Sequence, residues 1–239
     1  MSSEHRLTTG MTGLYGKHPG FGDFVAAGLP EGILHLVSDW LQNQLGAWRE
    51  VEGEHWQAVF DNAPMISFWI GPALVEGQPL RGVWAPSRDR GGRRFPLMIL
   101  QCGGAAPVLD SNQDFYSIAS LGLGNLLDAS VFEPRDAAER LQRELPTPSD
   151  APQADWPIFW ALNPAVEAQP LLAGLATADH AHASSTRSYW WFSANAGAGA
   201  GVLACQGLPG PAELGWMIAG GVQPAQEAMP EMARDGDEA

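Results

Sequence analysis

Basic residues are scarce in this sequence. Its 239 residues include 13 Lys and Arg against 27 Asp and Glu, which gives a formal net charge of -14 at pH 7. A field of that sign repels a phosphate backbone, so we expect no nucleic-acid partner. Hydrophobic residues make up 45% and charged residues 17%, a composition typical of a globular domain with a sizeable core.

Long apolar runs and export signals are also missing. Pro, Gly, Arg or Asp interrupts every candidate run before it reaches the roughly 20 apolar residues that a membrane-spanning helix needs. Residues 1–10 are polar and glycine-rich sequence follows them, unlike the basic start and apolar core of a secretory signal. We therefore expect a cytoplasmic protein without direct membrane insertion.

The chain has only two cysteines, Cys102 and Cys205, which lie far apart inside apolar segments. Neither has the short spacing of zinc sites or redox pairs, so both are predicted to be buried free thiols in a reducing compartment. His180 and His182 are two residues apart, but no cysteine or further carboxylate stands at ligand spacing. The sequence therefore predicts no metal site and no cofactor.

Catalytic motifs are absent as well. His18 follows Lys17 where a phosphate-binding loop needs Ser or Thr, and Val25 stands where a dinucleotide-binding loop needs its third glycine. No Gly-x-Ser-x-Gly sequence marks a hydrolase nucleophile. We predict that the protein is not an enzyme. The alternative is a phosphatase-like hydrolase that uses Asp23 with nearby arginines as an anion clamp.

Hydrophobic periodicity predicts an α/β (α+β) protein. Helices are predicted at residues 33–48, 54–61, 113–130, 135–145, near 169–176 and at 211–219, and strands at 11–17, 65–70, 80–85, 95–101, 188–193 and 202–206. Short connections favour antiparallel pairing. We expect a largely antiparallel sheet flanked by helices in one compact domain over residues 11–222, a long loop at 146–157, and an acidic, disordered tail over 223–239.

The strongest local feature is an arginine-rich run at residues 86–97. It holds Arg88, Arg90, Arg93 and Arg94 around Asp89, and with Arg81 it accounts for five of the 13 basic residues. Guanidinium groups pair with carboxylates or phosphates, so the run could receive an acidic partner. It could equally be an internal ion-pair knot in which Arg90 or Arg93 holds Asp89 and Asp23. Both interpretations stay open from the sequence.

Three segments resemble one protein family. The opening matches its Gly-Lys-x-Pro-x-x-Gly-Asp-Phe pattern at Gly16, Lys17, Pro19, Gly22, Asp23 and Phe24. The run at 86–97 resembles its hallmark Pro-Ser-x-Asp-Arg-x-Gly-Arg-x-Phe-Pro-Leu, and Trp190 and Trp191 fit its later Trp-Trp element. The family is TagF, associated with bacterial type VI secretion. One departure is Phe21, where the family commonly has Arg.

The resemblance implies a post-translational repressor of secretion. Such a protein would bind the forkhead-associated scaffold protein Fha or another type VI secretion component; the alternative is an adaptor or chaperone for secreted effectors. The residues expected to bind the partner or to fix the loop are Lys17, Asp23, Arg88, Asp89, Arg90, Arg93, Arg94, Trp190 and Trp191.

Overall fold

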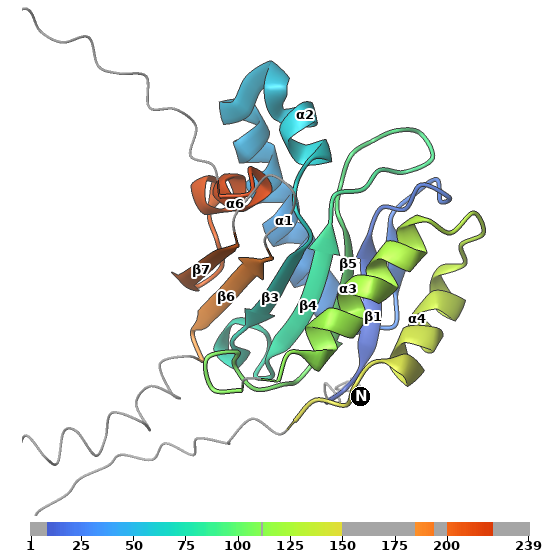
Figure 1. The fold of residues 1–239 in the computed structure, drawn as a ribbon, viewed down its shortest axis with the longest axis vertical. Coiled ribbons are helices and arrows are strands. Elements are labelled where there is room, and N and C mark those ends of the chain that lie inside the picture. The colour runs from blue at the N-terminus through green and yellow to red at the C-terminus, as the bar shows by residue number, and fades with distance from the viewer. Residues whose placement is uncertain (1–8, 111, 150–184, 194–199, 222–239) are drawn as a thin grey trace, which may run out of the picture.

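Seven strands form one antiparallel sheet in the computed structural model, which describes residues 9–110, 112–149, 185–193 and 200–221 (Figure 1). The strands are β1 (Thr12–Gly16), β2 (Val25–Ala27), β3 (Ile66–Ile70), β4 (Leu80–Ala85), β5 (Leu97–Cys102), β6 (Arg187–Phe192) and β7 (Gly201–Gln206). Their order is β2-β1-β5-β4-β3-β6-β7, and neighbours run antiparallel throughout. The predicted sheet is confirmed. Only β2 was missed, because three residues are too few to show an alternation.

Helices cover both faces of the sheet (Figure 1). On one face α1 (Glu31–Glu52) packs with α6 (Pro211–Ile218), and on the other lie α3 (Asp114–Leu127) and α4 (Pro134–Glu144). A 3-10 turn, η1 (Gly53–His55), joins α1 to α2 (Trp56–Asp61), and a second, η2 (Pro72–Leu74), follows β3. The predicted single compact α+β domain is confirmed, with most element ends shifted by a few residues.

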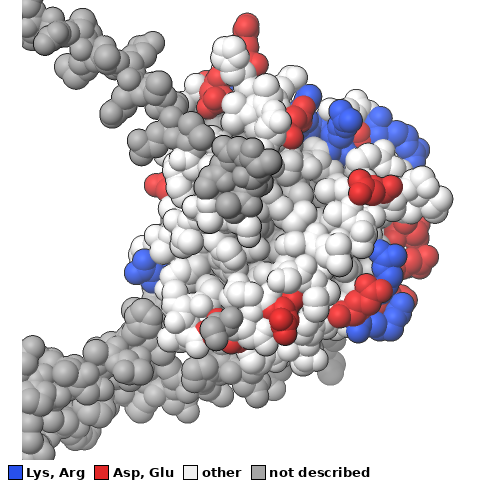
Figure 2. Space-filling view, viewed as in Figure 1, with Lys and Arg blue, Asp and Glu red and all other residues white. Residues whose placement is uncertain are grey.

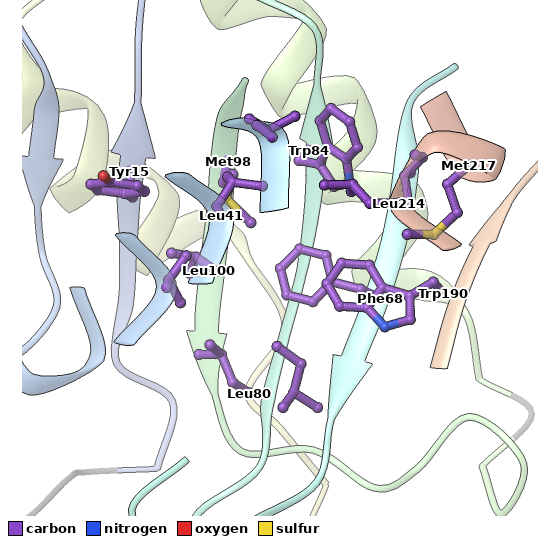
Figure 3. Close-up of a cluster of buried hydrophobic side chains, with 14 of the residues drawn as sticks. Tyr15, Leu41, Phe68, Leu80, Trp84, Met98, Leu100, Trp190, Leu214 and Met217 are labelled. Atoms are coloured by element: carbon purple, nitrogen blue, oxygen red, sulfur yellow. The ribbon is translucent and has the colours of Figure 1, made fainter. Parts of the chain in front are cut away.

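The core on the α1 side is rich in aromatic rings. Alternation along the strands sends Trp84, Met98 and Trp190 to this face, where they meet α1 and α6 (Figure 3). The helix supplies a stripe of buried side chains at three- and four-residue spacing: Ile33, Val37, Leu41, Leu45 and Trp48. The sheet is therefore held against α1 by large apolar surfaces.

The opposite face packs on α3 and α4. Leu14, Val83, Leu97 and Ile99 from the strands meet buried side chains that include Phe115 and Leu123 of α3 and Leu141 of α4. Gly122 was a possible weak point of the predicted helix at 113–130. A Cβ there would lie only 3.3 Å from the Leu141 side chain, so the missing side chain leaves room for the neighbouring helix.

Two segments that are distant in the sequence, the end of β1 and the β4–β5 loop, meet at one end of the sheet. Leu97 of β5 pairs with Ala85 of β4 and with Gly16 of β1, so the β4–β5 loop (residues 86–96) and Lys17 emerge together. Gly16 has a φ of 130°, and a Cβ there would collide with the carbonyl oxygen of Pro96. Only glycine allows β1 to lie this close to the loop.

Some predicted features lie outside the described residues. These are the helix near 169–176, His180, His182, the tail at 223–239 and most of the loop at 146–157. Both cysteines are free; Cys102 is buried and Cys205 is half-buried. Among the helices that the structure describes, none is long and apolar enough to cross a membrane.

Candidate functional site

Asp89 lies at the centre of the β4–β5 loop and accepts four hydrogen bonds. Its Oδ2 accepts from Lys17 Nζ and from Arg93 Nε, both at 2.6 Å, and its Oδ1 accepts from the backbone N–H groups of Gly91 and Arg93, both at 2.9 Å. The residue is only 2% exposed. Lys17 above all, with Arg93, holds the pKa of this carboxyl far below its usual range, because the donors stabilise the ionised form.

The backbone of the loop turns tightly around that carboxylate. The Gly92 N–H donates to the Asp89 carbonyl at 2.9 Å, and the Asp89 N–H donates to the Arg93 carbonyl at 3.1 Å. Gly92 has a φ of 82°, a left-handed conformation that favours glycine. Arg88 and Arg94 form a β-bridge at the base. The loop is thus a small closed structure with its aspartate inside.

Lys17 ties this loop to the end of β1. It is 5% exposed, its N–H donates to the Pro96 carbonyl at 3.2 Å, and its Nζ lies 4.8 Å from the centroid of the Phe24 ring. Lys17 and Asp89 are therefore a buried ion pair. Removing either partner leaves the other charge buried without its counterion.

Arg90 and Arg93 fasten a second loop, residues 19–23. The Nη2 of Arg90 donates to the Gly20 carbonyl at 2.6 Å, and the Nη2 of Arg93 donates to the Gly22 carbonyl at 3.0 Å. Asp23 is exposed, its Oδ1 accepts from the Phe24 N–H, and it forms no ion pair with any residue that the structure describes. The arginines hold this loop through its carbonyl groups.

Arg94 connects the loop to α2. Its Nε and Nη2 donate to the two carboxylate oxygens of Asp61, both at 2.7 Å, and these hydrogen bonds lower the pKa of Asp61. The Arg94 carbonyl accepts from Arg49 Nη2 at 3.1 Å. The Arg49 guanidinium stacks over Trp56, with its Cζ 4.4 Å from the ring centroid. The last turn of α1 is thereby joined to the same site.

These residues surround a pocket of about 500 Å³ between α1, α2 and the β4–β5 loop. Four cationic side chains line it: Lys17, Arg49, Arg93 and Arg94. Figure 2 shows Lys and Arg gathered at the upper right, over the end of the molecule that carries the loop. A second hollow of about 300 Å³, lined by Asp61, Ser87 and the exposed Arg88, lies on the other side of the loop.

Two of the predicted site residues, Trp190 and Trp191, lie apart from this site, and so does Arg81. Trp190 is fully buried in the α1-side core, and Trp191 points to the opposite face, where its ring centroid is 4.5 Å from that of Tyr116. Neither tryptophan has a ring contact or a side-chain hydrogen bond to the loop in the described parts of the chain. Arg81 is buried near the other end of β4, where it donates to the Gln101 side chain.

His18 and Arg49 belong to the site although the sequence analysis did not select them. Arg49 follows Leu41 and Leu45 at four-residue spacing, so it continues the buried stripe of α1. A charged residue at a position of a helix that is otherwise buried indicates a functional or paired side chain, and this pattern could have identified Arg49. His18 gave no such signal, because its contacts, with Leu126 and Phe132, come from residues more than a hundred positions away.

The His18 ring is buried and neutral, and it anchors the 19–23 loop. Its Nδ1 accepts from the Gly20 N–H at 3.0 Å, so its Nε2 carries the proton donated to the Leu126 carbonyl at 2.7 Å. Burial lowers its pKa from the ordinary 6.5, partly offset by the hydrogen bond to Leu126. A second proton, on Nδ1, would face the Gly20 N–H.

We therefore expect the free energy of unfolding to decrease as the pH falls below about 6.5. Below that pH the unfolded chain binds more protons at His18 than the folded chain does, because the folded pKa is lowered, so acid favours unfolding. Melting temperatures between pH 8 and pH 5 check this. In His18→Gln, whose side chain does not titrate, the melting temperature should depend less on pH. An unchanged dependence would mean that other groups cause it.

Within the described residues no three His, Cys, Asp or Glu side chains are grouped so that they could hold a metal ion. Burial raises the pKa of the Cys102 thiol to about 11, which leaves it protonated at neutral pH. What the site offers chemically is a set of guanidinium groups around a pocket, held in place by two carboxylates.

Comparisons with known proteins show the family of the chain and a solved structure with a similar fold. The family model described as "TagF N-terminal domain, Type VI secretion system-associated" matches residues 13–144. A crystal structure of the protein PA0076 from Pseudomonas aeruginosa superimposes with a TM-score of 0.69 at 29% identity, over 92% of this chain and 100% of that one. No curated protein matches the chain.

Proposed function

This chain belongs to the TagF family of type VI secretion system-associated proteins, and from that premise we propose that it regulates a bacterial type VI secretion system by binding another protein. It acts in the cytoplasm as a post-translational repressor. Its partner is the forkhead-associated scaffold protein Fha or another component of the secretion system.

The arginine surface at the β4–β5 loop supports this proposal. Arg88, Arg90 and Arg93 are exposed in a chain whose net charge is -14, and no carboxylate in the described residues pairs with Arg88 or Arg90. Exposed guanidinium groups on an acidic protein recognise an acidic surface of a partner and increase its rate of association. This is the observation that carries the proposed binding site.

The geometry favours binding over hydrolysis. The alternative hydrolase needs Asp23 beside the arginines, but Asp23 accepts a hydrogen bond from its own neighbour Phe24. Asp89 is the carboxylate that lies among the arginines, and it is buried and surrounded by four donors. Neither carboxylate is arranged to act on a substrate with the arginines as its clamp.

Charge reversal at the two arginines that have no carboxylate partner in the described residues tests the proposal. The double variant Arg88→Glu and Arg90→Glu should lose co-purification with Fha and release secretion in a strain that carries it. It should melt within a few degrees of the wild type, since the hydrogen bond that it loses, from Arg90 to the Gly20 carbonyl, is exposed to solvent and exposed charges contribute little to stability. Affinity purification from the native organism, read out by mass spectrometry, measures the binding.

A matched control is available on α4. Arg135→Glu with Arg143→Glu makes the same change in charge at exposed positions of another element, and it should keep binding and repression. If wild-type protein captures secreted effectors but no scaffold or membrane-complex protein, the repressor assignment is wrong and the adaptor function replaces it. Loss of binding in both double variants would show that net charge, rather than this loop, controls association.

A further inference from the structure

We propose that the pocket between α1, α2 and the β4–β5 loop receives one carboxylate of the partner protein together with an adjacent apolar side chain. In this proposal the pocket recognises a specific feature of the partner, and the exposed arginines alone do not determine which partner binds. This inference rests on the proposed binding function and names the chemistry that the partner presents.

Arg49 is the main reason for assigning a carboxylate. Its Nε is buried and has no hydrogen-bond partner, and the guanidinium forms no ion pair with any described residue. Its hydrogen bond goes from Nη2 to the Arg94 carbonyl, and burial lowers its pKa. This half-buried guanidinium therefore has no Asp or Glu partner in the part of the chain that the structure describes. A carboxylate that enters the pocket, which Arg49 lines, supplies the counterion that this guanidinium lacks.

Among the described residues, the charged side chains that line the pocket are all cationic. They are Lys17, Arg49, Arg93 and Arg94, and no described Asp or Glu lines it. Asp89 and Asp61 compensate from outside the lining, where they pair with three of the four cations. The local charge is thus positive inside a protein of strongly negative net charge. Such a pocket attracts an anion while the rest of the surface repels one.

The walls are apolar and aromatic. Leu45 and Phe95 are buried beneath the pocket, Trp56 is half-buried, and Phe24 is 36% exposed at its edge. Two guanidinium groups lie on Trp56, Arg49 at 4.4 Å and Arg94 at 6.0 Å from the ring centroid. These rings offer contact to an apolar side chain next to the anion, which a purely electrostatic site does not need.

A carboxylate fits better than a phosphate. Three of the four lining cations already have a carboxylate partner, Asp89 or Asp61, and among the described residues Arg49 is the one without an ion pair. One carboxylate matches one unpaired guanidinium, whereas a phosphate group carries close to two negative charges near neutral pH and is opposed more strongly by the net charge of -14. The occupant is therefore an Asp or Glu side chain, or a terminal carboxylate, beside an apolar residue.

Small probes separate these possibilities on the full-length protein. We expect 3-phenylpropionate, a carboxylate beside a ring, to shift the Trp56 indole N–H signal in a ¹H–¹⁵N spectrum with a dissociation constant on the order of 1 mM. The uncharged 3-phenylpropanamide and the ring-free acetate should each bind at least about tenfold more weakly. Trp56→Phe assigns the signal. Phenyl phosphate binding about tenfold more tightly than 3-phenylpropionate would overturn the choice of carboxylate.

Arg49→Gln should weaken the binding of 3-phenylpropionate by about tenfold, because a charged hydrogen bond between the guanidinium and the carboxylate is lost. Arg143→Gln, the same change at an exposed position on α4, should leave it unchanged, and melting temperatures confirm that both variants fold. Equal binding of the probe by wild type and Arg49→Gln would overturn the inference.

The same variant separates this inference from the proposed function. If Arg49→Gln co-purifies with Fha as well as the wild type does, the pocket assignment fails and the regulatory function stands. If wild-type protein binds the probe but captures no secretion component, the regulatory function fails and the pocket stands.

Discussion

Asp89→Ala should lower the melting temperature by roughly 10 °C and abolish partner binding. The substitution leaves Lys17, which is 5% exposed, without its counterion, and it also removes the acceptor of two backbone N–H groups in the loop. The β4–β5 loop then loses the centre around which it closes. Measurement at pH 7 by circular dichroism keeps the wild-type carboxyl ionised in both the folded and the unfolded chain.

The matched control is Arg93→Ala, a second partner of the same carboxylate. The Arg93 side chain is 66% exposed, and its removal leaves Asp89 paired with Lys17. We expect its melting temperature within a few degrees of the wild type, because water replaces an exposed ion pair at little cost. If Asp89→Ala is as stable as Arg93→Ala, Lys17 reaches solvent without the carboxylate and the pair does not fix the loop.

The ion pair of Asp89 with Lys17 also determines how the stability of the protein changes at acid pH. Asp89 has a pKa far below the ordinary carboxyl value of 3.8, so its contribution to stability is present above that value and decreases as acid protonates it. Asp61, held by Arg94, adds to the same effect. The contribution of these two carboxylates to stability begins to be lost near their ordinary pKa of 3.8, whereas that of His18 begins to be lost near 6.5, so the two onsets lie in different pH ranges.

Local patterns of apolar residues were sufficient to predict most of the helices and strands. The spacing of Ile33, Val37, Leu41 and Leu45 is enough to predict α1, and the strands predicted at 188–193 and 202–206 lie within a residue or so of β6 and β7. Short connections favoured antiparallel pairing, which the register bears out. These signals are carried by neighbours in the sequence, so no knowledge of packing was needed.

The internal arrangement of the site could not be predicted in this way. Whether a given arginine pairs inside the loop or faces solvent depends on contacts between residues far apart, such as Arg90 with Gly20 or Lys17 with Asp89. The sequence left two alternatives for the loop: a surface that receives an acidic partner, or an internal ion-pair knot. The structure has Asp89 at an ion-paired centre and leaves Arg88, Arg90 and much of Arg93 exposed around it.

The burial of the two tryptophans of β6 could not be predicted from the sequence either, because it depends on contacts between distant residues. Alternation places Trp190 and Trp191 on opposite faces, but the order of the strands decides how deeply each is buried. Because β6 pairs with β3, Trp190 meets Phe68, with ring centroids 4.9 Å apart, and lies under α1 and α6. Trp191 lies on the other face and is half-buried.

Trp190→Ala should therefore destabilise the protein strongly, by about 3–5 kcal/mol. The side chain is fully buried, its Nε1 donates to Ser188 Oγ at 2.9 Å, and its ring lies 5.2 Å from that of Trp40. The cavity left between the sheet and α1 cannot be refilled without moving the helix. We expect a melting temperature lower by roughly 10 °C, measured by circular dichroism.

Trp191→Ala is the comparison that separates packing from recognition. It removes the same side chain from the adjacent position, where partial exposure should reduce the cost to about half or less. At a temperature where both variants remain folded, Trp190→Ala should bind the partner normally, because its ring touches no surface. Lost binding in folded Trp191→Ala would add the α3 face of the sheet to the interface. A larger drop in melting temperature for Trp191→Ala than for Trp190→Ala would contradict the assignment of the main core to the α1 side.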